Sequence, residues 1–262
     1  MMRALLAYLE RHGAMPALVR SAISFVVVVA LWQLIATQFV TSSMLLAPPS
    51  EVLKAMVHEF QGGMLWKNTI ATSISLAVAF PVSVVLGVFI GLALCSNRLV
   101  SMMFGPMLTA LSSIPIIALA PLFVAWLGLG YASKFVLIGM VAIFPVIVTT
   151  ESALRSADSD LIEASRAFNA SGWQVFCTVS FPYAVSFIIG GVRVAWARAL
   201  VGVVVAEFFG SFAGYGYAIM AAGQTFDTAT LLAYVFILGV LGLVGSLLLE
   251  YAEKRLAPWR YA

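Results

Sequence analysis

Residues 69–95, TIATSISLAVAFPVSVVLGVFIGLALC, decide what kind of protein this is. The stretch contains 27 residues and no Asp, Glu, Lys or Arg. A helix of about 20 apolar residues is long enough to cross the hydrocarbon core of a bilayer. We therefore expect this stretch to be a transmembrane helix.

The composition of the whole chain agrees with this reading. The chain has 262 residues, of which 63% are hydrophobic and 10% charged, whereas soluble domains contain roughly 45–50% apolar and about 25% charged residues. So few charges cannot cover a protein of this size in water, which excludes a soluble globular enzyme. The two cysteines, Cys95 and Cys177, are too few for a disulfide framework or a metal cluster. A net charge of +3 is small for a nucleic-acid binder, so we expect no nucleic-acid partner.

Further stretches of spanning character occur along the chain. Together they predict an all-α, polytopic membrane protein with six transmembrane helices, near residues 21–40, 69–95, 104–127, 135–150, 183–206 and 228–249. The stretch 183–206 is included although it carries Arg193 and Arg198. The first stretch has a cleaved signal peptide as its alternative, but its apolar run exceeds the roughly 7–15 residues of such a peptide. We expect it to be a retained anchor.

The distribution of basic residues predicts the orientation. Three of them, Lys54, Lys67 and Lys134, fall on the side opposite the termini. Nine fall on the side of the termini: Arg3, Arg11, Arg20, Arg98, Arg155, Arg166, Lys254, Arg255 and Arg260. The positive-inside rule then places both termini in the cytoplasm.

This orientation divides the chain into segments. We expect a cytoplasmic segment over 1–20, a first transmembrane helix over 21–40 and a periplasmic loop with a surface helix over 41–68. A five-helix core follows over 69–250 and a cytoplasmic tail over 251–262.

The longest cytoplasmic loop, residues 151–182, carries six charged residues. We expect Asp160 to cap a short amphipathic helix and Glu163 to complete a capping box at its third position. Asn169 is expected to end this helix, because Asn tolerates the left-handed conformation. The loop is either a solvated connector or a docking element for a soluble partner.

Two segments lie on the other side of the membrane in this topology. Ser50 is expected to cap a surface helix over 51–60. The loop 210–228 is rich in Gly and aromatic residues and includes Tyr215. It is either an outer gate or a tight connection.

The sequence lacks the groups that an enzyme or a self-powered carrier needs. His12 and His58 lie on opposite sides of the predicted membrane, and no Gly-x-x-x-x-Gly-Lys-Ser/Thr loop is present to hold nucleotide phosphates. The ionisable residues inside the spans are Arg193, Arg198 and Glu207, all on the fifth span, while Lys134 and Glu250 are expected at the interfaces. Ion-coupled carriers usually need such groups near the midplane. Energy for uphill transport would therefore come through a partner on loop 151–182.

The second half of this loop carries a recognisable spacing. Glu163-Ala164-Ser165 is followed after three residues by Asn169 and after nine more by Val179-Ser180-Phe181-Pro182. This resembles the signature of binding-protein-dependent ABC importer permeases, Glu-Ala-Ala, three residues, Gly, nine residues, Ile-x-Leu-Pro. Asn169 replaces the signature's Gly, and both residues tolerate a left-handed helix end.

Other segments are similar to the nitrate/sulfonate/taurine/bicarbonate branch of that family. They are 47–53 (APPSEVL), 114–122 (IPIIALAPL), 126–130 (WLGLG), Ser133-Lys134, Phe144-Pro145, Ala206-Glu207 and 214–217 (GYGY). The resemblance implies a helical bundle like that of type I ABC importer permeases, located in a bacterial inner membrane. It implies three kinds of partner: a second permease, usually identical, two cytoplasmic ATPases that bind ATP and Mg, and a periplasmic solute-binding protein. No cofactor is then expected in this chain.

The resemblance also suggests the cargo. A small anion such as nitrate, a sulfonate, taurine or bicarbonate fits best, and a vitamin precursor or an aromatic acid is the alternative. From a different class of function, a membrane-embedded enzyme or scaffold remains as an alternative.

Two groups of residues are candidates for function. By resemblance, contact with the ATPase falls to Asp160, Glu163, Ala164, Arg166, Asn169, Gly172 and Pro182. For Glu163 the alternative is helix capping alone, and for Arg166 a positive-inside charge. Candidates for the passage or a gate are Ser113, Pro115, Arg198, Glu207 and Tyr215.

The passage candidates have alternatives as well. Ser113 could instead bond its own backbone, and Pro115 could be a static kink. For Glu207 the alternative is an internal partner such as an Arg or a backbone amide. Arg198 is a candidate for guiding an anion inward, whereas Arg193 is expected to snorkel to the interface.

Overall fold

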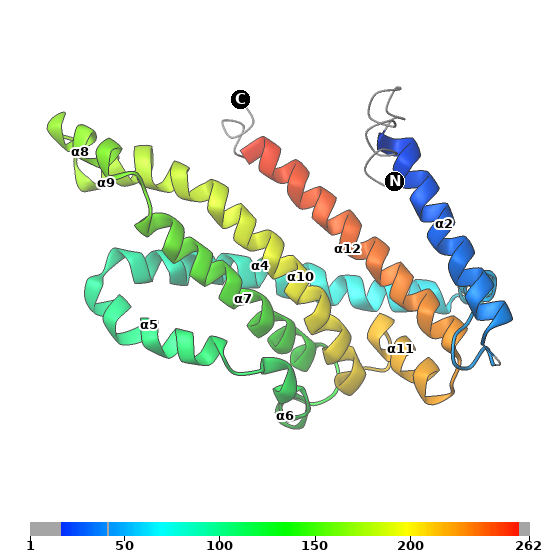
Figure 1. Cartoon of the computed structure of the whole chain (residues 1–262). Coiled ribbons are helices and arrows are strands. Elements are labelled where there is room, and N and C mark those ends of the chain that lie inside the picture. The colour runs from blue at the N-terminus through cyan, green and yellow to red at the C-terminus, as the bar shows by residue number, and fades with distance from the viewer. Residues whose placement is uncertain (1–16, 41, 257–262) are drawn as a thin grey trace, which may run out of the picture.

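The computed structural model describes residues 17–40 and 42–256, and it is drawn in Figure 1. Within these residues every regular element is a helix, so the predicted all-α class is confirmed. Parts of the predicted segments 1–20 and 251–262 lie outside the described residues, together with Arg3, Arg11, His12 and Arg260.

The long helices form the membrane-spanning part. They are α2 (Ala17–Gln38), α4 (Met64–Ser96), α7 (Tyr131–Arg155), α10 (Phe181–Gly210) and α12 (Thr228–Leu256). Five continuous helical segments of the described chain are long and apolar enough to cross a bilayer. Each of these five helices overlaps one of those segments. The shorter elements are α3 (Pro49–Gln61), α5 (Arg98–Ser112), the 3-10 turn η1 (Ile116–Leu119), α6 (Ala120–Leu127), α8 (Ser159–Ala167), α9 (Gly172–Val175), the π-helical turn η2 (Phe176–Ser180) and α11 (Tyr215–Gln224).

The predicted third span, residues 104–127, is not one helix. α5 ends at Ser112, and the chain then bends by 77° into η1 and α6. Pro115 lies in this break, where a proline cannot donate the backbone hydrogen bond that would continue a helix. Counted as one broken span, the bent pair brings the described residues to the predicted six spans.

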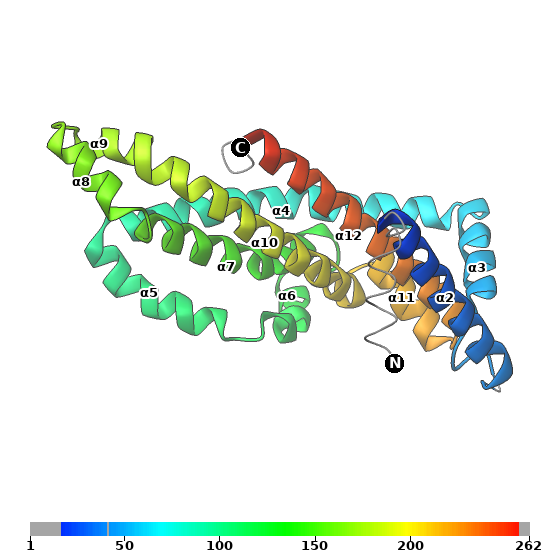
Figure 2. The ribbon, with the colours of Figure 1, turned by 45° about the horizontal axis from the view of Figure 1, so that its top comes forward.

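The packed centre of the bundle lies between α4, α7 and α10 (Figure 2). Ile138 and Val146 of α7 are completely buried there. Gly87 and Gly91 let α4 approach α7 closely, because a Cβ at Gly91 would lie only 2.6 Å from the Cβ of Thr150. These two glycines thus serve close helix packing.

One helical rod extends far beyond the bundle. α9 and η2 continue directly into α10, so helix runs over 39 residues from Gly172 to Gly210. At about 1.5 Å per residue this is roughly 58 Å, about twice the hydrocarbon core of a bilayer. α8 and α9 lie at one tip of the molecule, and the end of α12 lies toward the same side (Figure 1).

The helix α3 begins earlier than predicted. Pro49 is already helical and Pro48 is the N-cap, because proline's fixed φ suits a first helical turn. The prediction that Ser50 caps the helix is therefore wrong. The hydroxyl of Ser50 accepts a hydrogen bond from Nε2 of Gln33 at 3.2 Å, and its N–H donates to Oε1 of Gln33 at 3.1 Å. These two bonds attach α3 to α2.

Candidate functional site

The helix α8 at the tip starts with a different cap from the one predicted. Asp158 is the N-cap, and its carboxylate accepts a hydrogen bond from the N–H of Asp160 at 2.9 Å. The aspartate immediately before the first helical residue takes the cap, so Asp160 lies inside the first turn. The predicted capping box with Glu163 is therefore wrong.

Glu163 takes no part in capping α8. The residue lies in the second turn of α8 and is exposed. Among residues 17–40 and 42–256 its carboxylate has no hydrogen bond or ion pair, and the same holds for the exposed guanidinium of Arg166. Both charges are available to a partner molecule.

The turn after α8 follows the prediction. Asn169 adopts a left-handed conformation with φ of +61°. Behind it, the N–H of Ala170 donates to the carbonyl of Ser165 at 3.1 Å, which closes the helix end. Ser171 and Gln174 then form a capping box that starts α9.

Helical structure occupies much of the predicted cytoplasmic loop 151–182. α7 continues to Arg155, whose guanidinium pairs with Glu151 at 3.0 Å. Gly172 is the first residue of α9, and Pro182 lies in the rod two residues after the π-helical turn η2. The segment between α7 and α9 is 156–171, and it contains α8.

Large apolar side chains are exposed around this tip. Phe168 is 88% exposed and Trp173 is 73% exposed. Leu161 and the unpaired charges of α8 lie beside them in sequence. Exposed apolar groups next to charges, outside the bilayer, are typical of a surface that another protein covers.

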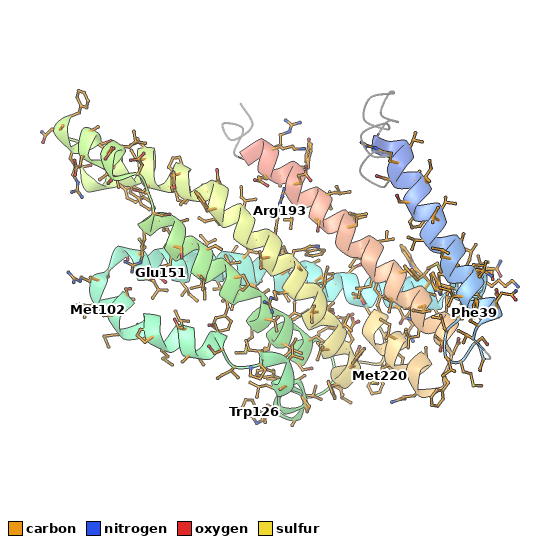
Figure 3. All side chains as sticks on the ribbon, viewed as in Figure 1. Phe39, Met102, Trp126, Glu151, Arg193 and Met220 are labelled. Atoms are coloured by element: carbon orange, nitrogen blue, oxygen red, sulfur yellow. The ribbon has the colours of Figure 1, made fainter. Side chains whose placement is uncertain are left out.

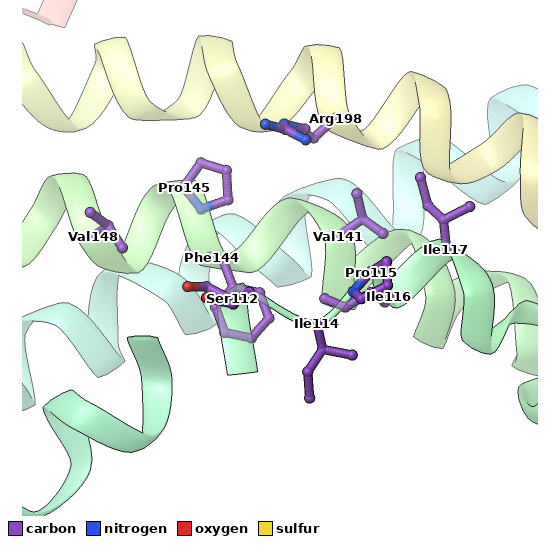
Figure 4. A pocket seen from close by; sticks show the side chains of 11 residues that line it. Ser112, Ile114, Pro115, Ile116, Ile117, Val141, Phe144, Pro145, Val148 and Arg198 are labelled. Atoms are coloured by element: carbon purple, nitrogen blue, oxygen red, sulfur yellow. The ribbon is translucent and has the colours of Figure 1, made fainter. Parts of the chain in front are cut away.

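A cavity of about 520 Å³ opens beside the break between α5 and η1 (Figure 4). It is lined by residues 112–117, by side chains of α7 and by Arg198 of α10. Three of the five predicted passage residues, Ser113, Pro115 and Arg198, therefore come together at one cavity. The hydroxyl of Ser113 also donates to the carbonyl of Thr109 at 3.0 Å, which is the bond to its own backbone given as the alternative for this residue.

The other two passage candidates lie elsewhere, at the end of the bundle opposite α8. Glu207 is completely buried, and its carboxylate accepts hydrogen bonds from the hydroxyl of Thr72 at 3.0 Å and from the N–H of Gly216 at 2.9 Å. The N–H of Tyr215 donates to the hydroxyl of Thr72 at 2.9 Å. A backbone amide is one of the internal partners expected for Glu207.

This buried polar cluster extends across four more contacts. Asn68 accepts from the N–H of Gly214 at 3.0 Å and donates to the hydroxyl of Tyr234 at 2.8 Å. Tyr234 in turn donates to the carboxylate of Glu59 on α3, and the hydroxyl of Tyr215 bonds that of Thr69. The cluster thus joins α3, α4, α10, α11 and α12.

The sequence prediction missed the α4 members of this cluster. Asn68 and Thr72 are polar residues four positions apart on an apolar helix, and both are buried. Residues four positions apart share one helix face. The sequence of this pair therefore indicates a polar contact inside the membrane.

Two charged residues are also placed differently from the prediction. Arg193, labelled in Figure 3, stays partly exposed, and its guanidinium forms an ion pair with Glu253 of α12 at 2.6 Å. Lys134, expected at an interface, is 3% exposed and donates to the hydroxyl of Ser211 at 3.3 Å. Its ammonium group lies 4.4 Å from the centre of the Tyr131 ring. Lys134 is therefore buried with partners, whereas the side chain of Arg193 stays 39% exposed beside its partner.

Comparison with known proteins shows which proteins this chain is similar to. The family model described as "Binding-protein-dependent transport system inner membrane component" matches residues 83–258. The protein named as the aliphatic sulfonates transport permease SsuC of Bacillus subtilis is 31% identical, over 96% of this chain and 90% of its own. The formylaminopyrimidine transport permease ThiX of Halalkalibacterium halodurans is 28% identical, over 90% of this chain and 94% of its own.

A solved structure shares the fold. A chain of the MetNI methionine ABC transporter, in an inward-facing conformation, superposes with a TM-score of 0.60. It is 20% identical, and the match covers 74% of this chain and 96% of that one. The bent α5–α6 pair, the long rod with its exposed tip and these similarities lead to one conclusion: this chain belongs to the binding-protein-dependent transport system inner membrane components, as an ABC importer permease.

Proposed function

We propose that this chain forms the solute passage of an ATP-driven importer and is moved through its α8 tip by a cytoplasmic ATPase. The observation that supports this most is the continuous rod from Gly172 to Gly210. One end of the rod adjoins α8 with its exposed Glu163, and its middle carries Arg198 at the cavity. A force on α8 and α9 would therefore displace a wall of the cavity.

The proposed assembly contains three other kinds of subunit. Two ATPases bind ATP and Mg at the cytoplasmic side, a second permease, identical to this one, completes the passage, and a solute-binding protein delivers cargo from the periplasm. The excess of Lys and Arg on the side of α8 supports cytoplasmic termini. No cofactor is assigned to this chain.

The proposed cargo is a small anion such as nitrate, a sulfonate, taurine or bicarbonate. The name of the SsuC relative, which refers to aliphatic sulfonates, supports this class. The second candidate is a vitamin precursor or aromatic acid, and the name of the ThiX relative, a formylaminopyrimidine permease, favours it.

Reconstitution tests the proposal. The chain is purified with the ATPase that accompanies it and placed in liposomes with the binding protein and its labelled ligand. We expect uptake that needs hydrolysable ATP and stops with a non-hydrolysable analogue, while the isolated chain hydrolyses no ATP. Chemical turnover of solute by the isolated chain, or uptake without the ATPase, would contradict the proposal and favour the enzyme alternative.

A further inference from the structure

Arg198 is the one charged side chain that lines the cavity beside the α5–η1 break. It projects from α10 across from Pro145 and Val141 of α7 (Figure 4). The remaining lining residues are apolar except for Ser112 and Ser113. In the described part of the chain the cavity wall therefore carries a positive charge and no carboxylate.

The guanidinium of Arg198 differs from that of its neighbour Arg193. Arg193 is neutralised by Glu253, whereas Arg198 makes no hydrogen bond or ion pair within residues 17–40 and 42–256. Arg198 lies twelve residues before the end of α10 at Gly210, which is about 18 Å along the helix and within the depth of a bilayer core. A cation at this depth is costly unless water or an anion compensates it.

Ser112 and Ser113 carry no charge, so they neither add to nor oppose the positive charge of Arg198 in the cavity wall. The hydroxyls of Ser112 and Ser113 both donate to the carbonyl of Thr109, at 2.7 and 3.0 Å. In this arrangement their oxygens face a ligand as acceptors only. The attraction for a negative group thus comes from Arg198 alone.

The rest of the wall suits an apolar group. Phe144, Val148 and Ile117 line the same cavity as the guanidinium. A volume of about 520 Å³ falls within the usual range of small-molecule sites, roughly 300–1,000 Å³. A ligand that carries one anionic head and a short apolar body would use both kinds of surface.

We propose that this cavity is a binding site for an organic monoanion, such as an alkanesulfonate or a carboxylate, that carries no ammonium group. Arg198 holds the anionic head, and the apolar wall of α7 and η1 packs against the body of the ligand. An ammonium group would find no carboxylate in the cavity wall, and an inorganic anion would leave the apolar wall uncovered. The site rests on the proposed function, because it is the passage of that importer, and within the proposed cargo class it favours a sulfonate over taurine, nitrate and bicarbonate.

Ligand binding to the purified, full-length chain in detergent tests the site. Affinities are measured by ligand-induced thermal stabilisation with propanesulfonate and with its terminal amino derivative, which differ by one ammonium group. For the wild-type chain we expect propanesulfonate to bind at least about tenfold more tightly. Arg198→Gln is expected to weaken propanesulfonate binding by about tenfold or more, because the charged donor is lost.

Two further variants serve as controls for the binding result with Arg198→Gln. Arg198→Lys preserves the charge but not the two parallel donors, so we expect intermediate affinity and an unchanged preference for propanesulfonate. Arg98→Gln removes an exposed charge at the start of α5, outside the cavity, and is expected to bind like wild type. Equal affinity of the wild-type and Arg198→Gln chains, or of the two ligands, would overturn the site.

An uptake experiment distinguishes failure of the cavity site from failure of the importer proposal. The assembled complex is tested for ATP-driven uptake with wild-type and Arg198→Gln chains. Uptake that is equally fast for both would overturn the cavity site and leave the importer intact. A wild-type complex without ATP-driven uptake would contradict the importer proposal, whatever the binding measurement on the isolated chain shows.

Discussion

Replacing Glu207 by alanine is expected to lower the unfolding temperature of the purified chain by on the order of 10 °C. The side chain is completely buried and satisfies the hydroxyl of Thr72 and the N–H of Gly216. Alanine would leave both donors without this acceptor at a completely buried position, which costs several times more than losing an exposed contact.

The measurement is thermal unfolding in detergent, followed by tryptophan fluorescence. Glu207→Gln is the matched variant, because an amide of nearly the same shape can still accept from Gly216 while the charge is lost. We expect its unfolding temperature to lie between those of the wild type and the alanine variant. An alanine variant as stable as the wild type would show that this cluster does not hold the helices together.

Reversing the charge of Glu163 is expected to abolish ATP-driven uptake without affecting folding. In Glu163→Arg the change lies on the exposed face of α8, where the carboxylate has no partner within the described residues. The fold therefore loses no contact, and the unfolding temperature should stay at the wild-type value. A partner surface that pairs with the carboxylate would instead face a like charge, which is costly at an interface.

Uptake by the reconstituted complex measures this effect. Glu163→Gln is expected to reduce uptake less than Glu163→Arg, since it removes attraction without adding repulsion. The control is Glu250→Gln on α12, which alters an exposed carboxylate paired with Lys254 and is expected to transport like wild type. Wild-type uptake by Glu163→Arg would disprove the docking role of α8.

The spans could be predicted from the sequence because membrane insertion depends on local composition. A stretch such as 69–95 is apolar over its full length, and no distant contact is needed to recognise it. At the break in the third span, Pro115 removes its own backbone donor, which is also a local effect. Asn169 likewise adopts its left-handed conformation through a local preference.

Features that depend on distant partners could not be predicted. Thr72 and Glu207 are 135 positions apart, and no local pattern shows that their side chains meet. Arg193 had an equally good local explanation in snorkelling, yet its partner Glu253 lies on another helix. The predicted cap of α8 was wrong for another reason. Asp158 and Asp160 are both good caps, and the choice between them depends on where the helix begins.

Site-specific photo-cross-linking shows whether a cytoplasmic ATPase contacts the α8 tip, as the proposed drive of this passage requires. A benzophenone amino acid replaces Phe168, which is 88% exposed at the end of α8, or, as the control, Phe226, which is 68% exposed between α11 and α12 at the opposite end. After irradiation of the assembled complex, we predict that the probe at Phe168 is joined to the ATPase and the probe at Phe226 is not. Absence of the ATPase adduct at Phe168, or an equal yield at Phe226, would contradict the account.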